Sequence, residues 1–447
     1  MSNQTFLIGT GVESIYACNL TSNGQLQLLN EIKCGKGSSW LLPRNDLLYV
    51  VNAQIDKIEI FTIDDRIQGK LTLKNTISSM GNGPCSLDID STGKWLAVAN
   101  YGSQGISNFV VFPLNNSNLP EEKDAQINTI DGHGPNSDRQ DHSHCHQVLF
   151  HQDYLYVTDL GTDTLNVYHF NDANGNVSLV GNRIKTEAGA GPRHIIFHPN
   201  KSLVFLCNEL NSTTNVYRIN ASCEQFECLQ TIKTRRQEDE NDSTKENYPA
   251  ELQFTPDDKY LLVSNRGDEN LVIFNINENN NEILSIKEHL DCRGSFTRYF
   301  TFDPTGTFLL IANQKSNNLI CFSYNKDNDD YYRSRLFCFI LTSQSNLENR
   351  SRAIYETWGH RCGRFVFITR LNSSTSYTIY DNQYKYLKED QLSIQYIPTL
   401  SNKVRSTLLF LNKYYSNYDW YFKADDDTYI IVENLLTREP FQLSNRF

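Results

Sequence analysis

The sequence predicts an all-β seven-bladed propeller followed by a smaller, partial α/β domain. Three observations predict it. A strand-type segment recurs about every 48 residues, and the composition favours strands. Near residue 325, both the charge balance and the periodicity change.

The composition of the 447-residue chain favours strands and excludes several functions. It has 24 Tyr and 24 Phe against 2 Met, and aromatic residues are enriched in strands. The net charge of −11 argues against a nucleic-acid binder, which needs a basic surface. The chain contains no apolar run of roughly 18 residues, which is the length that a membrane-spanning helix needs. Its N-terminal residues do not have the pattern of a secretory signal. We therefore expect a cytoplasmic chain.

In each repeat, an apolar strand ends in Asn or Asp, and the strand that follows it has an aromatic residue near its end. Successive anchors lie 48, 59, 49, 57 and 48 residues apart, and the two long gaps contain insertions. Four short strands per 48 residues is the size of one propeller blade. The anchors are Asn52, Asn100, Asp159, Asn208, Asn265 and Asn313.

The N-terminal segment FLIGTG…SIYACNL…LQLLNEI adds a seventh unit, with three strands instead of four. Propellers are commonly closed by a strand from the other end of the chain, but here the chain runs into a polar stretch at 326–332. We interpret that stretch as a linker and residues 1–325 as the propeller. A missing closing strand would leave an exposed sheet edge.

Residues 333–447 have a different character. Residues 1–325 carry a net charge of −13, whereas residues 326–447 carry 16 Lys and Arg against 14 Asp and Glu, a net charge of +2. Segments 335–342, 365–369 and 392–397 are predicted strands, and 347–362 and 402–418 have helical spacing. This alternation predicts a layered α/β domain.

Several blade segments resemble the seven-bladed propeller lactonases of the bacterial 6-phosphogluconolactonase type. The segments include VANYGS (98–103), SHCHQV (143–148), AGAGPRHIIFHP (188–199), CNELNST (207–213) and TRYFTFDPTGTFLLIANQKSNN (297–318). The resemblance implies an enzyme that hydrolyses a sugar lactone such as 6-phosphogluconolactone. It implies no cofactor for the propeller and a small-molecule sugar lactone as its partner.

The chemistry of lactone hydrolysis selects the candidate residues. Water needs a general base, and the oxyanion and an anionic substrate group need positive charge. Equivalent blade positions project to one end of the channel, so the resemblance implies an active cleft. Glu209 or His146 is assigned as the base, and Arg193, Arg266 and Arg298 bind the substrate anion and the oxyanion.

Three alternating histidines in the propeller segment are candidates for a metal site. On a strand, His142, His144 and His146 would share one face because side chains alternate. The spacing offers no carboxylate or thiolate to complete the site, so no metal is predicted there.

The second module contains the acidic turn DDD at 425–427, in WYFKADDDTYIIVENL. With TSQSNLENRSRAIYETWGHRC and NKVRSTLLFL, it resembles the core 1 β1,3-galactosyltransferases, which are Fringe-like and have a GT-A-like, nucleotide-sugar-binding α/β fold. The resemblance implies cofactor binding by Asp425, Asp426 and Asp427. Asp425 and Asp427 would hold Mn²⁺ for UDP-galactose.

The galactosyltransferase module is expected to be truncated, because its acceptor half would lie beyond residue 447. Three alternatives stay open. Glycoprotein-N-acetylgalactosamine 3-β-galactosyltransferase, forming the O-glycan core 1, is one candidate for the main activity. A non-catalytic propeller scaffold is another. A gene model that joins pieces of two genes is the third, because a complete transferase would be expected in the Golgi lumen.

Overall fold

The computed structural model describes residues 4–22, 24–103, 105–220, 225–240, 245–277, 282–325, 330–332, 336–341, 364–370, 377–380 and 420–425. The chain divides into two compact units, Met1–Cys321 and Phe322–Phe447. Among the described residues, no helix has the length and apolar character that crossing a bilayer requires.

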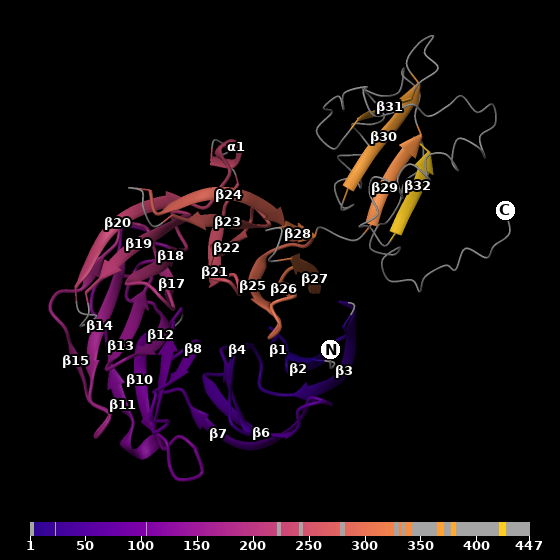
Figure 1. Ribbon diagram of the computed structural model, residues 1–447. Coiled ribbons are helices and arrows are strands. Elements are labelled where there is room, and N and C mark those ends of the chain that lie inside the picture. Colours follow the sequence, from indigo (N-terminus) through magenta and orange to yellow (C-terminus); the bar gives the residue numbers. More distant parts are fainter. Residues whose placement is uncertain are drawn as a thin grey trace. The chain divides into compact units, whose positions relative to one another are not determined.

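Seven antiparallel sheets surround a common centre in the described part of the chain, which confirms the predicted propeller (Figure 1). In each complete blade, the chain starts at the innermost strand and moves outward. The strands of the first four blades are β1 Gln4–Ile8, β2 Ser14–Leu20 and β3 Leu26–Lys33; β4 Ser38–Arg44, β5 Leu47–Asn52, β6 Lys57–Asp65 and β7 Lys70–Ser78; β8 Pro84–Ile89, β9 Trp95–Asn100, β10 Asn108–Pro113 and β11 Gln126–Asn128; and β12 Cys145–His151, β13 Tyr154–Asp159, β14 Thr164–Phe170, β15 Val177–Leu179 and β16 Ile184–Lys185.

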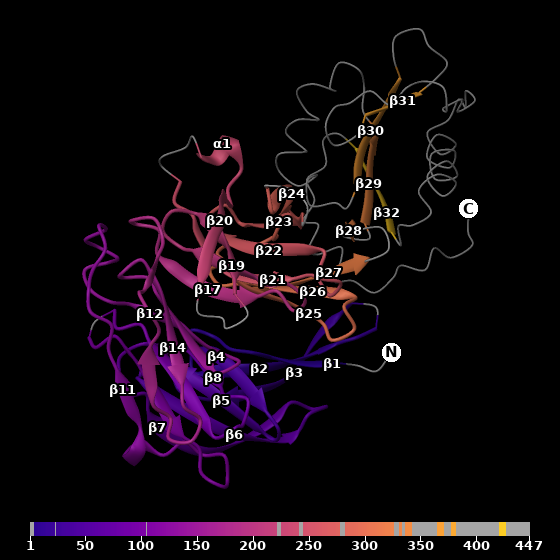
Figure 2. The ribbon, with the colours of Figure 1, turned by 60° about the vertical axis from the view of Figure 1, so that its left-hand side comes forward.

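The last three blades follow the same order. Their strands are β17 Pro192–Phe197, β18 Leu203–Asn208, β19 Thr213–Ile219 and β20 Phe226–Lys233; β21 Tyr248–Phe254, β22 Tyr260–Arg266, β23 Asn270–Ile276 and β24 Leu284–Asp291; and β25 Thr297–Phe302, β26 Phe308–Asn313, β27 Asn318–Asn325 and β28 Asp330–Tyr332. β28 pairs with β27 inside the stretch expected to be a linker. A 3₁₀ turn, Glu122–Asp124, and a short helix, α1 Gln237–Glu240, lie in the insertions, and α1 stands out from the body of the propeller (Figure 2).

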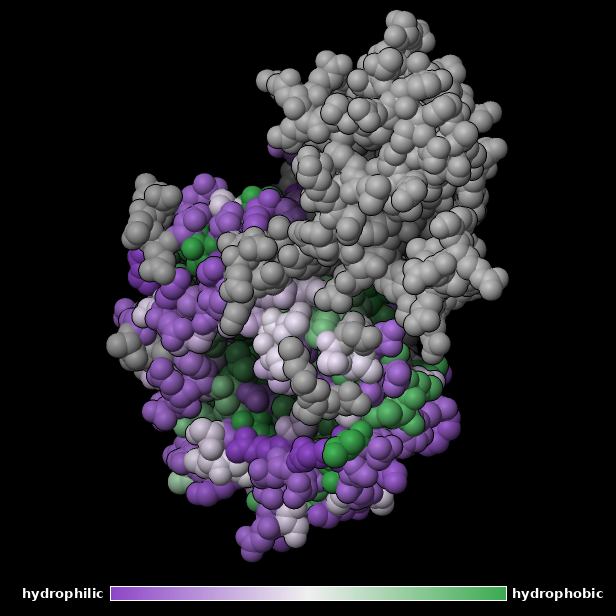
Figure 3. Space-filling view, turned by 45° about the vertical axis from the view of Figure 1, so that its right-hand side comes forward, coloured by the Kyte–Doolittle hydropathy of each residue, from purple (hydrophilic) through white to green (hydrophobic). Residues whose placement is uncertain are grey.

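The second strand of each complete blade is buried on both faces, which explains the unbroken apolar runs in the sequence. In β5, β18 and β22 every residue is buried. The core consists of clusters between neighbouring blades; one joins Tyr49 and Val51 of blade 2 to Leu87 and Val98 of blade 3. One face of the molecule shows apolar surface in a hollow with polar residues around it (Figure 3).

The repeated Asn at the end of the second strand ties consecutive blades together. The side-chain amide of Asn100 donates to the carbonyl of Ser79, which directly follows the outer strand of the preceding blade, at 2.9 Å. Asn265 donates in the same way to the carbonyl of Thr234, also at 2.9 Å. Asn313 donates in the same way to the carbonyl of Cys292, so at these three junctions the anchor amide supplies the donor that a buried backbone carbonyl needs. Asn208 instead donates to Thr213 and Asn215 of its own blade.

Blade 1 has three strands, as predicted, and no described strand pairs with the other edge of β1. Side chains close the ring at this point. Leu20 of blade 1 packs with Phe308 and Leu310 of blade 7, and the Gln4 amide donates to Asp303 at 2.9 Å. The junction between the first and last blades thus depends on packing of apolar side chains instead of a shared sheet.

The second unit contains a mixed four-stranded sheet in the order β31-β30-β29-β32. Its strands are β29 Leu336–Leu341, β30 Arg364–Arg370, β31 Tyr377–Tyr380 and β32 Trp420–Asp425. β29 is parallel to β30 and to β32. The strands predicted at 335–342 and 365–369 are present as β29 and β30. Strand β31 was not predicted. The strand expected at 392–397 and the helices expected at 347–362 and 402–418 lie outside the described residues.

Candidate active site

A β-bulge recurs at the second residue of the innermost strands. The pairing register shifts around His146 in β12, around Arg193 in β17 and around Arg298 in β25. A bulge leaves one residue without a cross-strand partner and changes the direction of its side chain. Three of the predicted site residues therefore occupy one structural position in three blades.

The other two predicted residues form a second set of equivalent positions. Glu209 follows anchor Asn208 and Arg266 follows anchor Asn265. The same position holds Tyr101 in blade 3 and Gln314 in blade 7. The repeat thus places two functional positions in each blade, one at the bulge and one after the anchor.

The Glu209 carboxylate is the centre of the site and is bound by three arginines. Arg266 lies 2.7 Å from Oε2, Arg193 lies 3.1 Å from the same oxygen, and Arg139 lies 2.5 Å from Oε1. The Glu209 side chain is 6% exposed. Glu209 and Arg193 belong to blade 5, Arg266 belongs to blade 6 and Arg139 to the insertion before blade 4, so the cluster joins blade 5 to blade 6 and to that insertion.

Charge explains the protonation state of Glu209. Burial by itself raises the pKa of the carboxyl, but Arg266, Arg193 and Arg139 outweigh it, and the pKa lies well below its usual range. The carboxylate is therefore ionised near neutral pH. Since it is committed to three guanidinium groups, it is a weak acceptor for a proton from water.

His146 has the opposite character. It is buried, and its Nδ1 has no hydrogen-bond partner among the described residues. Its ring lies 5.1 Å from that of His194 and 5.7 Å from that of Tyr101, measured between centroids. Burial, followed by the charge of Arg193, holds the pKa of His146 well below its usual value. The imidazole is therefore neutral near pH 7, with a ring nitrogen that no described residue occupies.

A second acidic group lies beside the cluster. His194 Nδ1 is 3.3 Å from Glu251 Oε2, and both side chains are buried. Burial and Arg193 lower the pKa of His194 to about 4, although Glu251 acts in the other direction. This pair holds the His194 ring against that of His146.

Arg298 completes the set of predicted residues and has the weakest contacts. Its Nη1 is 3.4 Å from Gln314 Oε1, and the side chain is half-buried. Burial, together with repulsion from Arg193 and Arg266, lowers the pKa of Arg298 to about 9. The site therefore contains more positive charge than Glu209 neutralises, and an anion bound near Arg298 would relieve that repulsion.

A pocket of about 430 Å³ adjoins this cluster through Arg139 and Tyr248. The backbone carbonyl of Tyr248 accepts a hydrogen bond from Arg266 Nε at 2.9 Å, which joins the pocket wall to the arginine cluster. The pocket is cationic on one side. Its lining is Asn136, Arg139, Leu210, Asn211, Ser212, Lys233, Arg235, Lys245, Glu246, Asn247 and Tyr248.

The five propeller residues predicted from the sequence are brought together, but sequence reasoning missed Arg139 and Tyr101. Arg139 belongs to the long insertion between blades 3 and 4, where the repeat provides no register. Tyr101 follows anchor Asn100, so its position in the repeat was a usable signal. The Tyr101 hydroxyl lies 3.3 Å from Arg139 Nη2.

The structure separates the three alternating histidines. His146 belongs to β12, whereas His142 and His144 precede that strand. They do not share one strand face, and His142 and His144 instead meet the carboxylate of Asp141. In the second unit, Asp425 is the last residue of β32, and Asp426 and Asp427 lie outside the described residues.

The family scan matches residues 5–331 to "Lactonase, 7-bladed beta-propeller". The chain belongs to this lactonase family. The match includes all the propeller site residues and ends before the second unit's sheet. The lactonase propeller thus agrees with the resemblance drawn from the blade segments.

Curated and solved relatives agree with this membership. The chain is 35% identical over 304 residues to a 6-phosphogluconolactonase of Formosa agariphila, covering 65% of this chain and 82% of the relative. A putative 6-phosphogluconolactonase structure from Bacteroides fragilis is 28% identical with a TM-score of 0.64, covering 74% of this chain and 93% of that chain. A Lactobacillus plantarum protein structure is 27% identical with a TM-score of 0.65, covering 74% and 94%.

Proposed function

We propose that the propeller hydrolyses a sugar lactone of the 6-phosphogluconolactone class. One observation carries the proposal: a neutral, buried histidine with an unpartnered nitrogen lies beside a site that has more arginines than carboxylates. An ester carbonyl that develops negative charge needs such an environment. The names of the relatives indicate the same substrate class.

The geometry favours His146 over Glu209 as the general base. His146 Nδ1 takes a proton from water, and the hydroxide oxygen bonds to the lactone carbonyl carbon. The carbonyl π pair moves to the oxygen, and the guanidinium groups of Arg193 and Arg266 stabilise that charge. When the pair returns, the ring C–O bond breaks. The departing ring oxygen takes the proton from His146, leaving a hydroxyl and a carboxylic acid, which then loses its proton to solvent and becomes the carboxylate.

Glu209 then has a positioning role. Its carboxylate holds the guanidinium groups of Arg193 and Arg266 in place, so that they need no reorganisation as charge develops. Arg298 is half-buried and has one long contact, so it remains available for an anionic group of the substrate.

The adjoining pocket would take the phosphate end of the substrate. Arg235 and Lys245 are already paired with Asp268. In contrast, the ammonium of Lys233 donates a hydrogen bond to the backbone carbonyl of Asn211 at 3.2 Å. Lys233 is exposed, so it can turn toward a phosphate without breaking an ion pair. Its effect should therefore be specific to phosphorylated lactones.

The test measures acid release by the full-length chain from 6-phosphogluconolactone and from unphosphorylated gluconolactone, corrected for spontaneous hydrolysis. His146→Gln should lower kcat at least ~100-fold, the usual contribution of acid–base catalysis. Arg193→Ala should also lose most of the activity. His169→Ala, which changes an exposed histidine on β14, is the matched control.

The phosphate assignment has its own pair of variants. Lys233→Ala should raise KM for the phosphorylated lactone and leave KM for gluconolactone unchanged, whereas Lys70→Ala, at an exposed position on β7, should change neither. A folded wild-type chain that is no faster than buffer on both lactones would contradict the lactonase proposal and favour a non-catalytic scaffold.

For the second unit we propose, more narrowly, binding of a UDP-sugar with Mn²⁺. The support is the resemblance of 333–447 together with the position of Asp425 at the end of a strand parallel to β29. Mn²⁺-dependent binding of UDP by the full chain, lost in Asp425→Asn, would support it. Equal UDP binding with and without Mn²⁺ would contradict it.

A further inference from the structure

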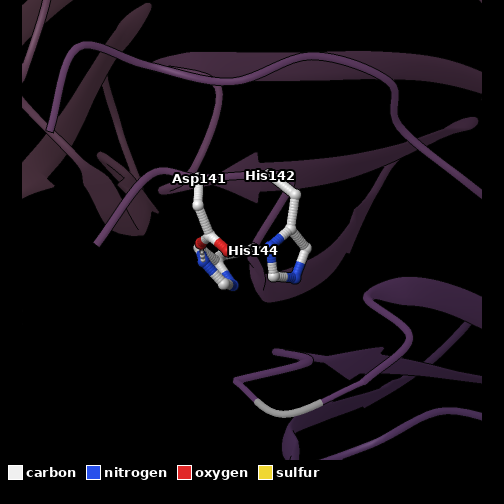
Figure 4. A group of neighbouring side chains, drawn as sticks. All are labelled: Asp141, His142 and His144. Carbon is white, nitrogen blue, oxygen red and sulfur yellow. Dashed lines mark hydrogen bonds and ion pairs between the residues drawn. The ribbon is translucent and has the colours of Figure 1, made fainter. Parts of the chain in front are cut away.

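We propose that Asp141, His142 and His144 form a binding site for a divalent transition-metal ion. All three side chains extend from one loop toward each other (Figure 4). Their potential ligand atoms lie within 4.8 Å of one another. The site is separate from the proposed catalytic base and does not depend on the proposed lactonase function.

The hydrogen-bond geometry of the two rings carries the proposal. His144 Nδ1 lies 2.8 Å from the carbonyl oxygen of Tyr101, and His142 Nε2 lies 3.1 Å from that of Gly102. A carbonyl oxygen only accepts, so both of these nitrogens must carry the ring hydrogen. In a neutral imidazole, the other nitrogen then has a lone pair.

Both lone pairs face the same carboxylate. His142 Nδ1 is 2.9 Å from Asp141 Oδ2, and His144 Nε2 is 3.2 Å from Asp141 Oδ1. An ionised carboxylate is also only an acceptor, so each contact places one acceptor against another. Such contacts need a cation between the atoms.

A metal ion satisfies both contacts at once, because it can accept a lone pair from each imidazole and from the carboxylate. The two rings lie close enough to share one ion, with their centroids 4.3 Å apart. Metal bonds of about 2.1 Å at angles of 90–109° separate ligand atoms by about 3.0–3.4 Å. The observed separations of 2.9 and 3.2 Å are close to this range.

The surroundings are those of a built site. Each ring donates its hydrogen to a backbone carbonyl, as ligating histidines usually do. His144 is fixed by stacking on Tyr101, with centroids 4.5 Å apart and planes inclined by 14°. Its backbone N–H donates to the buried Asp159 at 2.8 Å, so the loop is held before any metal binds.

The exposure of the site indicates an open coordination sphere. Asp141 is 60% exposed and His142 39%, whereas His144 is 4% exposed. Water can therefore supply the remaining ligands. Two imidazoles and a carboxylate favour Zn²⁺, Co²⁺ or Fe²⁺ over Mg²⁺ and Ca²⁺, which prefer oxygen ligands.

The ion would position part of the active site. Asp141 is two residues from Arg139, which binds Glu209, and Tyr101 contacts both His144 and Arg139. Metal binding would fix this loop and so the guanidinium of Arg139.

The experiment is titration of the tag-free, chelator-stripped full-length chain with Zn²⁺ by calorimetry and with Co²⁺ by visible absorption. We expect one site per chain, a cobalt spectrum without thiolate bands, and no comparable binding of Mg²⁺. Asp141→Asn and His142→Gln change exposed side chains and should fold. Each should weaken Zn²⁺ binding by at least ~100-fold, because loss of outer partners alone costs 10–100-fold.

His169→Ala is the matched control and should bind Zn²⁺ like the wild type. Three outcomes would overturn the proposal: no binding by the wild type, wild-type affinity in both ligand variants, or a cobalt–thiolate spectrum that assigns the ion to cysteine.

Discussion

Replacing Glu209 with Gln tests the central charge cluster most directly. The variant keeps the size of the side chain but removes the charge that three arginines share. Arg139, Arg193 and Arg266 would lose the carboxylate that they share, although Arg266 would keep its bonds to the carbonyls of Tyr248 and Pro249.

The expected cost follows from burial. Removing one partner of a buried ion pair costs about 3–5 kcal/mol, because the remaining charge is uncompensated. For a domain of this size, each kcal/mol corresponds to roughly 2 °C, so Tm should fall by about 6–10 °C. The matched control is Glu227→Gln. Glu227 is 66% exposed and lies 2.7 Å from Arg218, and such surface pairs contribute about 0–1 kcal/mol.

Anion rescue makes the experiment specific. Inorganic phosphate should raise the Tm of Glu209→Gln more than that of the wild type, because the variant has an unneutralised anion site. Thermal unfolding followed by circular dichroism, with and without phosphate, measures both effects. A Tm within about 1 °C of the wild type, or equal phosphate effects, would refute the reasoning.

The remaining predictions concern pH and packing. Because burial and neighbouring arginines lower the pKa of Arg298 to about 9, calorimetry should show 6-phosphogluconate binding weakening above pH 9; constant affinity up to pH 10 would contradict this. Burial raises the pKa of Asp88 to about 6, so its charge destabilises the fold above that pH. Asp88→Asn should therefore raise the free energy of unfolding in urea by at most about 3 kcal/mol at pH 7.5 and leave it unchanged at pH 4. An equal effect at both pH values would exclude that cause. Phe308→Ala should cost about 3–5 kcal/mol in urea unfolding by opening the junction of the first and last blades, whereas Leu28→Ala, at a position 65% exposed, should cost little; equal costs would contradict the role of that junction.

The repeat explains why so much of the fold was predictable. Each anchor strand is buried on both faces, so it must be mostly apolar, and this local requirement recurs from blade to blade. In three blades the final Asn also donates to a backbone carbonyl at the blade junction. The resemblance to the lactonase family implied His146, Arg193, Glu209, Arg266 and Arg298 as site residues, and the periodicity agreed with it, because equivalent positions meet at one end of the ring.

The insertions were the part that periodicity could not resolve. Arg139 and Asp141 both lie between blades 3 and 4, where no repeat relates sequence position to spatial position. The three alternating histidines were interpreted as one strand face, but β12 begins only at Cys145. Asp141 was missed as a partner because the chain before the strand bends back on itself.

The sequence by itself determined the number of blades and the missing strand of the first blade, because the spacing of the buried, apolar anchor strands shows them directly. Only the tertiary structure decided which charges compensate one another. Glu209 was an equal candidate for the base until three arginines, one of them from an insertion, were found around it. The state of an ionisable group depends on charges within a few ångströms, and residues 139, 193 and 266 become neighbours only when the ring closes.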